Sequence, residues 1–136
     1  MGKIILVVDD DPDIVKIVEL RLTANGYEVH TAHTGEEGLS KCKLIRPDAV
    51  IMDLMMPDMD GSSVAHEMKD DPNTCNIPVI FLTGAVKASE VPKSHKIGGQ
   101  YFLAKPFKAE DLLKMLQLVL SEEQVRLHIV QCTAVK

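Results

Sequence analysis

Residues 50–61, VIMDLMMPDMDG, begin as a buried strand and then turn into a loop. The apolar run before Asp53 is typical of a strand covered on both faces, as in a parallel sheet. The loop that follows contains Pro57 and closes at Gly61. A hydrophobic strand that ends on a carboxylate is unusual, because an unpaired charge is costly to bury. Asp53 is therefore expected to have polar neighbours at the end of its strand.

Short apolar runs like this one alternate with longer helical patterns along the chain. Strands are expected at 3–8, 27–32, 49–54, 79–84 and within 101–107, and helices at 12–24, 35–44, 62–70 and 109–120. Asp11 precedes Pro12 as the N-cap of the first helix, and Thr34 with Glu37 forms a capping box for the second. Asn25-Gly26 ends the first helix.

The stretch from Ala85 to Gly99 is the least regular part of the chain. The alternation predicts a helix there, although Pro92 and Gly98-Gly99 weaken the helical pattern. Five strands that alternate with helices require crossover connections, which indicates a parallel sheet with helices on both faces. The fold class expected is α/β, a flavodoxin-like doubly wound (βα)5 fold with a five-stranded parallel sheet in the order 2-1-3-4-5.

Composition limits the classes of function. The 136 residues suit one domain, and a formal net charge of −5 argues against nonspecific binding to nucleic acid or to an anionic membrane. The three cysteines lie far apart, in a pattern that fits reduced thiols better than disulfides. No apolar run approaches the roughly 20 residues that cross a bilayer. The cytoplasm is the expected location.

In a parallel sheet the carboxyl ends of all strands lie at one edge, where ligands bind. The polar residues at the predicted strand ends are Asp9, Asp10, Asp53, Thr83 and Lys105. Each has an ordinary explanation when it is taken alone, such as a turn, a solvated loop or a surface lysine. Their coincidence at five positions of one edge favours a functional site.

The residue types at this edge indicate phosphoryl chemistry. Three crowded carboxylates repel one another unless they share a cation, and carboxylates without nearby histidine or cysteine suit Mg²⁺, with Mn²⁺ as an alternative. Mg²⁺, a lysine and a hydroxyl together complement a phosphoryl group. A carboxylate can also act as the nucleophile and form an aspartyl phosphate. Asp53, near the middle of the sheet, is the best candidate.

Four sequence blocks in the expected order resemble the receiver domain of response regulators, the CheY-like family of two-component signal transduction. The blocks are VVDDDP (7–12), MDLMMPDMDG (52–61), FLTG (81–84) and YFLAKPF (101–107). The resemblance covers roughly residues 3–120. It implies a receiver domain at 1–121 and a C-terminal tail or linker stub at 122–136.

The resemblance implies a role for each matching residue. Asp53 would accept a phosphoryl group from a histidine of a sensor kinase or of a phosphotransfer protein. Asp10 and Asp53 would bind Mg²⁺ directly, together with the backbone carbonyl of Met55. Asp9 would hold a metal-bound water.

The remaining roles concern the response to phosphorylation. Lys105 would pair with the phosphoryl oxygens, Thr83 would swing its hydroxyl onto them, and Phe102 would turn inward behind Thr83. Many relatives have tyrosine at the position of Phe102. This chain therefore has no hydroxyl at that position of the switch. Pro57 and Gly61 would shape the loop after Asp53. Pro106 would shape the loop after Lys105, with a cis peptide between these two residues.

The implied function is a phosphorylation-dependent signalling switch. A phosphoryl group adds about −1.5 to −2 charges and would bias two packings of one face. That face comprises the helix expected within 85–99, the strand within 101–107 and the helix at 109–120. It would control a downstream protein or a missing output domain. The protein would not be an enzyme, although it would assist its own phosphorylation and dephosphorylation.

Two alternatives remain beside this function, and a third is rejected. A receiver-like docking module would never take phosphate. A Mg²⁺-dependent phosphatase of the haloacid dehalogenase type needs a second acid two residues after its nucleophile, where this chain has Met55. A calcium loop at 56–67 is rejected, because its first position is Met56 and a strand precedes it. The sequence leaves open the kinase, the signal, the output, the oligomeric state, and whether the domain stands alone or comes from a longer chain.

Overall fold

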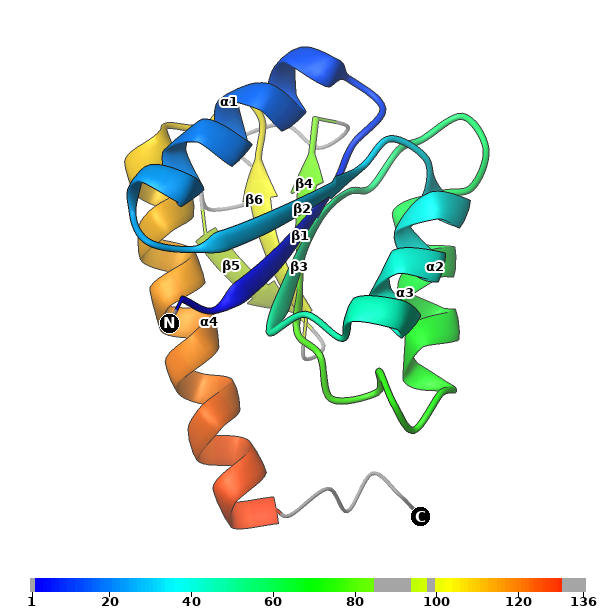
Figure 1. Ribbon diagram of the computed structural model, residues 1–136, viewed down its shortest axis with the longest axis vertical. Coiled ribbons are helices and arrows are strands. Elements are labelled where there is room, and N and C mark those ends of the chain that lie inside the picture. Colours follow the sequence, from blue (N-terminus) through cyan, green and yellow to red (C-terminus); the bar gives the residue numbers. More distant parts are fainter. Residues whose placement is uncertain (1, 85–93, 98–99, 131–136) are drawn as a thin grey trace.

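The computed structural model of the protein describes residues 2–84, 94–97 and 100–130 (Figure 1). The strands are β1 (Ile4–Val8), β2 (Glu28–Ala32), β3 (Ala49–Asp53), β4 (Val79–Thr83), β5 (Ser94–Ile97) and β6 (Gln100–Ala104). The helices are α1 (Pro12–Ala24), α2 (Gly35–Ile45), α3 (Gly61–Lys69) and α4 (Ala109–Val130).

The strands form one sheet in the order β2-β1-β3-β4-β6-β5. β1, β2, β3, β4 and β6 run parallel, so β6 is the fifth parallel strand and the predicted order 2-1-3-4-5 is confirmed. The continuous apolar runs of β1, β3 and β4 are almost wholly buried, as expected for strands covered on both faces.

A sixth strand was not predicted. β5 pairs antiparallel with β6 at the edge of the sheet, and it lies inside the stretch where the alternation predicts a fourth helix. That helix prediction is wrong for residues 94–97, while residues 85–93 lie outside the described part of the chain. The reason is local: Pro92 and Gly98-Gly99 leave too short a segment for a stable helix, and the free edge of β6 offers backbone hydrogen bonds to it.

Helices cover both faces of the sheet, with α1 and α4 on one face and α2 and α3 on the other (Figure 1). The core under α1 and α4 includes Val18, Leu22 and Leu116, all at most 2% exposed. The core under α2 and α3 includes Val64, Met68 and Phe81. Side chains of alternate residues along each strand enter these two cores in turn, which fixes the register of the sheet.

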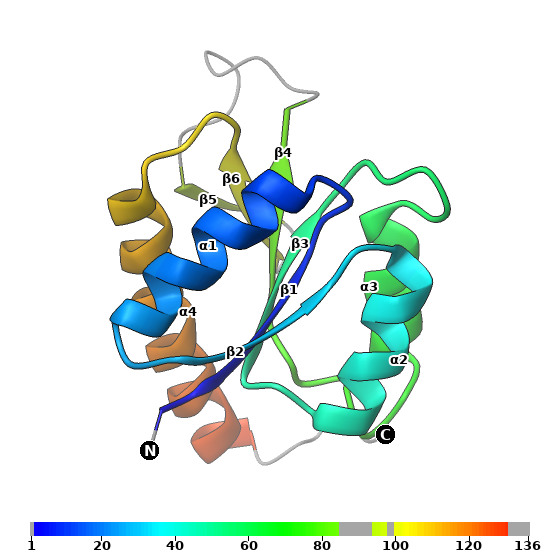
Figure 2. The same cartoon turned by 45° about the horizontal axis from the view of Figure 1, so that its top comes forward.

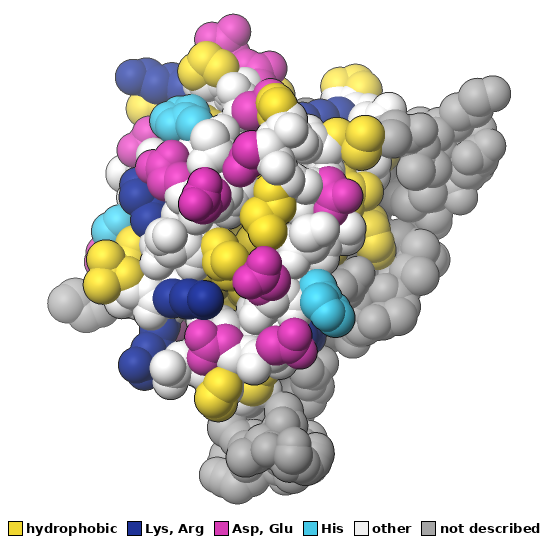
Figure 3. All heavy atoms as spheres, turned by 90° about the vertical axis from the view of Figure 1, so that its right-hand side faces the viewer, with side chains coloured by type: hydrophobic (Ala, Val, Ile, Leu, Met, Phe, Trp, Pro, Cys, Tyr) yellow, Lys and Arg dark blue, Asp and Glu magenta, His cyan; other side chains and the backbone are white. Residues whose placement is uncertain are grey.

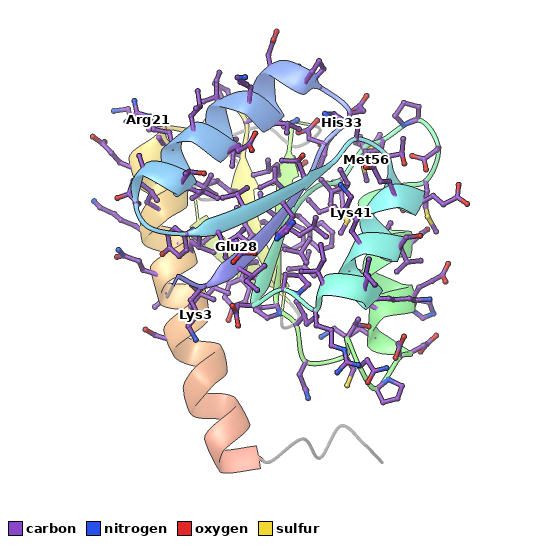
Figure 4. The ribbon with its side chains drawn as sticks, viewed as in Figure 1. Lys3, Arg21, Glu28, His33, Lys41 and Met56 are labelled. Atoms are coloured by element: carbon purple, nitrogen blue, oxygen red, sulfur yellow. The ribbon has the colours of Figure 1, made fainter. Side chains whose placement is uncertain are left out.

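Polar side chains hold the helix ends as the sequence predicts. The Asp11 carboxylate caps α1 by accepting from the Asp13 N–H, and Thr34 Oγ1 accepts from the Glu37 N–H at the start of α2. Lys41 of α2, labelled in Figure 4, donates to the backbone carbonyl of Thr31 in β2. The Lys41 bond thus attaches α2 to the strand that precedes it.

The last helix is longer than expected, since α4 continues to Val130 rather than ending near Leu120. In Figure 1 its C-terminal half extends beyond the lower edge of the sheet. Within the described residues, no helix combines the length and the apolar character needed to span a membrane.

Candidate functional site

The register of the parallel strands brings the predicted polar residues to one edge of the sheet. Val8 pairs with Met52, so Asp9, the residue after β1, is level with Asp53 at the end of β3. Thr83 ends β4 beside Ala104 of β6. Lys105 follows directly, and its N–H donates to the Thr83 carbonyl at 2.8 Å. Figure 2 turns this edge of the sheet forward.

Three carboxylates gather at this edge. Asp9, Asp10 and Asp53 each offer an oxygen, and these atoms lie within 4.8 Å of one another. Asp9 is fully buried and Asp53 is 5% exposed, whereas Asp10 is exposed. The Asp9 backbone fixes this placement, since its N–H donates to the Ala32 carbonyl at 3.1 Å. The sequence prediction that these acids converge agrees with this geometry.

Lys105 links two of the acids. Its Nζ lies 3.2 Å from Asp9 Oδ2 and 3.3 Å from Asp53 Oδ1. Burial alone would lower the pKa of Lys105, but the carboxylates of Asp9 and Asp53 outweigh it, so this pKa lies above its ordinary value. Lys105 is therefore a permanent cation in the site.

For Asp53 the surroundings favour the uncharged form of the side chain. Burial raises its pKa, and the neighbouring Asp9 carboxylate raises it further. The Lys105 ammonium and the Met55 N–H lower this pKa, but they do not fully offset the increase. The Asp53 carboxylate therefore carries negative charge that the protein balances only in part.

This charge pattern fits a divalent cation. The donor atoms that converge are carboxylate oxygens, which are the ligands of hard ions such as Mg²⁺ and Mn²⁺. Lys105 balances one of the three carboxylate charges, so a small cation between the acids would relieve the remaining repulsion.

The other predicted residues lie around this cluster. Thr83 is buried, at 1% exposed, and Phe102 is half-buried, with its ring stacked on Phe81 at a centroid distance of 5.5 Å. The Met55 side chain is 62% exposed at the start of the loop after β3. The peptide between Lys105 and Pro106 is cis, as the resemblance implied.

Gly61 has a steric reason to be glycine. A Cβ at this position would lie 2.6 Å from the backbone oxygen of Asp53, and the Gly61 N–H donates to the Leu54 carbonyl at 2.8 Å. The loop thus returns against the strand end that carries Asp53. Pro57 lies exposed in the same loop.

Sequence reasoning missed one residue of this region. The Asp58 carboxylate accepts from the N–H groups of Gly35 and Glu36, at the start of α2. The sequence pattern of 56–67 resembles a calcium loop, but Asp58 and Asp60 are both helix caps, for α2 and α3 respectively. No local signal identifies Asp58, because its partners lie more than 20 residues away.

Fold and site together define an α/β protein with an acidic site at the carboxyl edge of a parallel sheet. The sequence model of the response regulator receiver domain matches residues 5–117, most of the chain. The chain therefore belongs to the family of response regulator receiver domains of two-component signal transduction.

Relatives agree with this assignment. The chain is 34% identical over 116 residues to the DNA-binding dual master transcriptional regulator RpaA of Synechocystis sp., covering 85% of this chain and 48% of RpaA. It is 41% identical over 106 residues to the response regulator PleD of Caulobacter vibrioides, covering 78% of this chain and 23% of PleD. The chain thus spans less than half the length of these two relatives.

Solved structures confirm the fold class. A CheY-like receiver domain protein from Methanospirillum hungatei has a TM-score of 0.79 at 26% identity, covering 93% of this chain and 99% of that one. The chemotaxis response regulator CheY4 of Vibrio cholerae has a TM-score of 0.76 at 34% identity, covering 88% and 99%.

Proposed function

We propose that this domain is a switch in which Asp53 accepts a phosphoryl group from a histidine of a sensor kinase or of a phosphotransfer protein. The observation that supports it most is the carboxylate cluster, with its acids within 4.8 Å and the Lys105 ammonium bonded to two of them. Such a site places a nucleophilic carboxylate oxygen beside the Lys105 ammonium. The negative charge that Lys105 does not balance favours the binding of a metal ion.

A divalent cation completes the site in this proposal. Asp10, Asp53 and the backbone carbonyl of Met55 would hold Mg²⁺, or Mn²⁺ in its place, and Asp9 would hold a water bound to the metal. When it is bound, the cation supplies positive charge that neutralises the phosphoryl oxygens. The donor set fits this role because its side-chain members are carboxylates.

The side chains of the domain perform the transfer. An Asp53 carboxylate oxygen attacks phosphorus, a P–O bond forms, and the P–N bond to the donor histidine breaks, so that the imidazole leaves with the electron pair. Lys105 holds its charge beside the phosphoryl oxygens, and the Thr83 hydroxyl donates a hydrogen bond to one of them. The burial of Asp9, Asp53 and Thr83 limits competing water.

Phosphorylation then shifts a conformational equilibrium. Lys105 follows β6 and Thr83 ends β4. New bonds from both residues to the phosphoryl group would bias the packing of β5, β6 and α4. Phe102, stacked on Phe81, takes part through its ring and not through a hydroxyl. This face would meet a downstream protein or an output domain.

The wider assignments are proposals as well. Residues 1–121 form the receiver domain and 122–136 a tail, in the cytoplasm. Direct nucleic-acid binding by this segment is not proposed, since the net charge is −5 and acidic side chains are spread over the face in Figure 3. The domain is a phosphoacceptor and not an enzyme, because Met55 occupies the place of the general acid that a phosphatase needs.

Intact-mass measurement tests the phosphoacceptor proposal. The protein is incubated with acetyl phosphate and Mg²⁺, with EDTA in a parallel sample, and Asp53→Asn is the control variant. The proposal is supported if only the unsubstituted protein with Mg²⁺ gains the mass of one phosphoryl group. No gain indicates a docking module, and multiple turnover of p-nitrophenyl phosphate indicates a phosphatase.

A further inference from the structure

The loop from Leu54 to Asp60 is attached to a helix that lies far from it in the sequence. Asp58 Oδ1 accepts from the Gly35 N–H at 3.0 Å, and Asp58 Oδ2 accepts from the Glu36 N–H at 3.1 Å. In Figures 1 and 2 this loop lies beside the first turn of α2. One carboxylate thus binds two successive backbone donors of another element.

These bonds complete the N-terminus of α2. The first N–H groups of a helix have no partner within the helix. Asp58 supplies acceptors for Gly35 and Glu36, and Thr34 Oγ1 accepts from the Glu37 N–H at 3.0 Å. The backbone N–H groups of Gly35 and Glu36 hold the pKa of Asp58 below its ordinary value. Asp58 is therefore a charged acceptor at the positive end of the helix.

Close packing joins the same elements. A Cβ on Gly35 would lie 3.0 Å from both Cβ and the backbone oxygen of Met59 in the loop. A Cβ on Gly38 would lie 2.8 Å from Cγ2 of Val8, the last residue of β1. Because α2 contacts the loop at one glycine and β1 at another, it links the loop to the strand that leads into Asp9.

The loop carries Met55 between two fixed points. On one side the Met55 N–H bonds to the Asp53 carboxylate. On the other side Met56, labelled in Figure 4, is 8% exposed in the core under α2 and α3. Beyond Met56, the Asp58 carboxylate bonds residues 57–59 to the first turn of α2. Asp58 therefore adds an attachment to α2 two residues beyond the buried Met56, and it supports this side of the Met55 peptide.

We propose that Asp58 is a positioning residue, which holds the Met55 peptide against the acidic site by bonding the loop to α2. This inference rests on the proposed function, because it assigns Asp58 to the cation affinity and to the phosphorylation rate of Asp53. The rival explanation is purely structural: Asp58 would stabilise α2 and nothing else. The two explanations differ in what happens when α2 loses a different cap.

The chain offers that matched control in Thr34→Ala. This variant removes the other side-chain cap of the same helix and leaves the loop untouched. Asp58→Ala removes the loop attachment, and Asp58→Asn keeps one acceptor oxygen and the side-chain volume. Each variant is measured for melting temperature, for Mg²⁺ affinity by calorimetry, for the rate of phosphorylation by acetyl phosphate, and for amide hydrogen exchange in residues 54–60 without metal.

We expect Asp58→Ala to weaken Mg²⁺ binding about tenfold, the lower end for residues that orient metal ligands. Phosphorylation slows with it, and exchange in the loop accelerates. Asp58→Asn falls between this variant and the unsubstituted protein, and it carries the test if Asp58→Ala does not fold. Thr34→Ala lowers the melting temperature to a similar extent but leaves Mg²⁺ affinity and loop exchange unchanged.

Equal effects of Thr34→Ala and the Asp58 variants on Mg²⁺ affinity would overturn the inference, as would unchanged affinity in both Asp58 variants. If the unsubstituted protein neither binds Mg²⁺ nor takes a phosphoryl group, the proposed function fails and this inference falls with it. If only the inference fails, the unsubstituted protein is still phosphorylated normally. This result distinguishes it from a failure of the proposed function.

Discussion

Asp53 lies in an environment that opposes its own ionisation. Burial and the Asp9 carboxylate raise its pKa, and Lys105 offsets this only in part. A carboxyl group with a raised pKa in the folded protein binds its proton more tightly there than in the unfolded chain. It penalises folding as the pH rises from the ordinary aspartate value, about 3.9, through the raised one. Above the raised pKa the penalty is fully present.

Asp53→Asn is therefore expected to stabilise the metal-free protein at pH 7. Removal of the like charge beside Asp9 should raise the free energy of unfolding by about 1 kcal/mol, the usual scale of a single substitution. The gain should disappear as the pH falls below the ordinary aspartate pKa, where Asp53 is protonated anyway. Urea denaturation at both pH values measures it. A loss of stability at pH 7 would contradict this account of the site.

Gly61 is a second residue whose identity follows from the structure. Its Cβ would lie 2.6 Å from the Asp53 backbone oxygen, so Gly61→Ala must move the strand end or the loop. We expect a loss of about 2 kcal/mol in the free energy of unfolding, as in overpacked sites.

Gly84→Ala is the matched control for Gly61→Ala. A Cβ at Gly84 would have Lys105 Cβ as its nearest neighbour, at 3.9 Å, which is ordinary van der Waals contact. Its effect should stay within about 0.5 kcal/mol. Equal losses in the two variants, measured by chemical denaturation, would disprove the steric explanation.

At the level of helices and strands, the sequence predicts most elements because their signals are local. Asp11 and Thr34 cap the helices that they were expected to begin. β5 could not be predicted, because its hydrogen bonds depend on the free edge of β6 and not on its own pattern. The Asp58 cap of α2 was missed for the same kind of reason, since it is a tertiary contact.

The helix α4 allows a direct comparison of two leucines. Leu116 is fully buried against the sheet, whereas Leu118 on the same helix is 54% exposed. Leu116→Ala should lower the free energy of unfolding by about 3 kcal/mol, because it leaves a cavity in the core. Leu118→Ala should change it by less than about 0.5 kcal/mol. Thermal or urea denaturation of both variants checks the orientation of α4, and similar losses would show that it is wrong.

Across the whole molecule, the parallel order of strands converts scattered residues into one site. Asp9 and Lys105 are 96 positions apart, yet their side chains lie 3.2 Å from each other, because β1, β3, β4 and β6 end at one edge. The sequence predicts this convergence, since topology alone requires it. It does not predict the pKa shift of Asp53, which depends on burial and on distances between side chains.

The central claim is that Asp53 carries the phosphoryl group, and chemical trapping tests it most directly. After incubation with acetyl phosphate and Mg²⁺, borohydride reduces an aspartyl phosphate to homoserine, which tandem mass spectrometry locates in the sequence. We predict homoserine at position 53, and none in the sample with EDTA. Homoserine at another aspartate, or its absence from every peptide while Mg²⁺ is present, would contradict the claim.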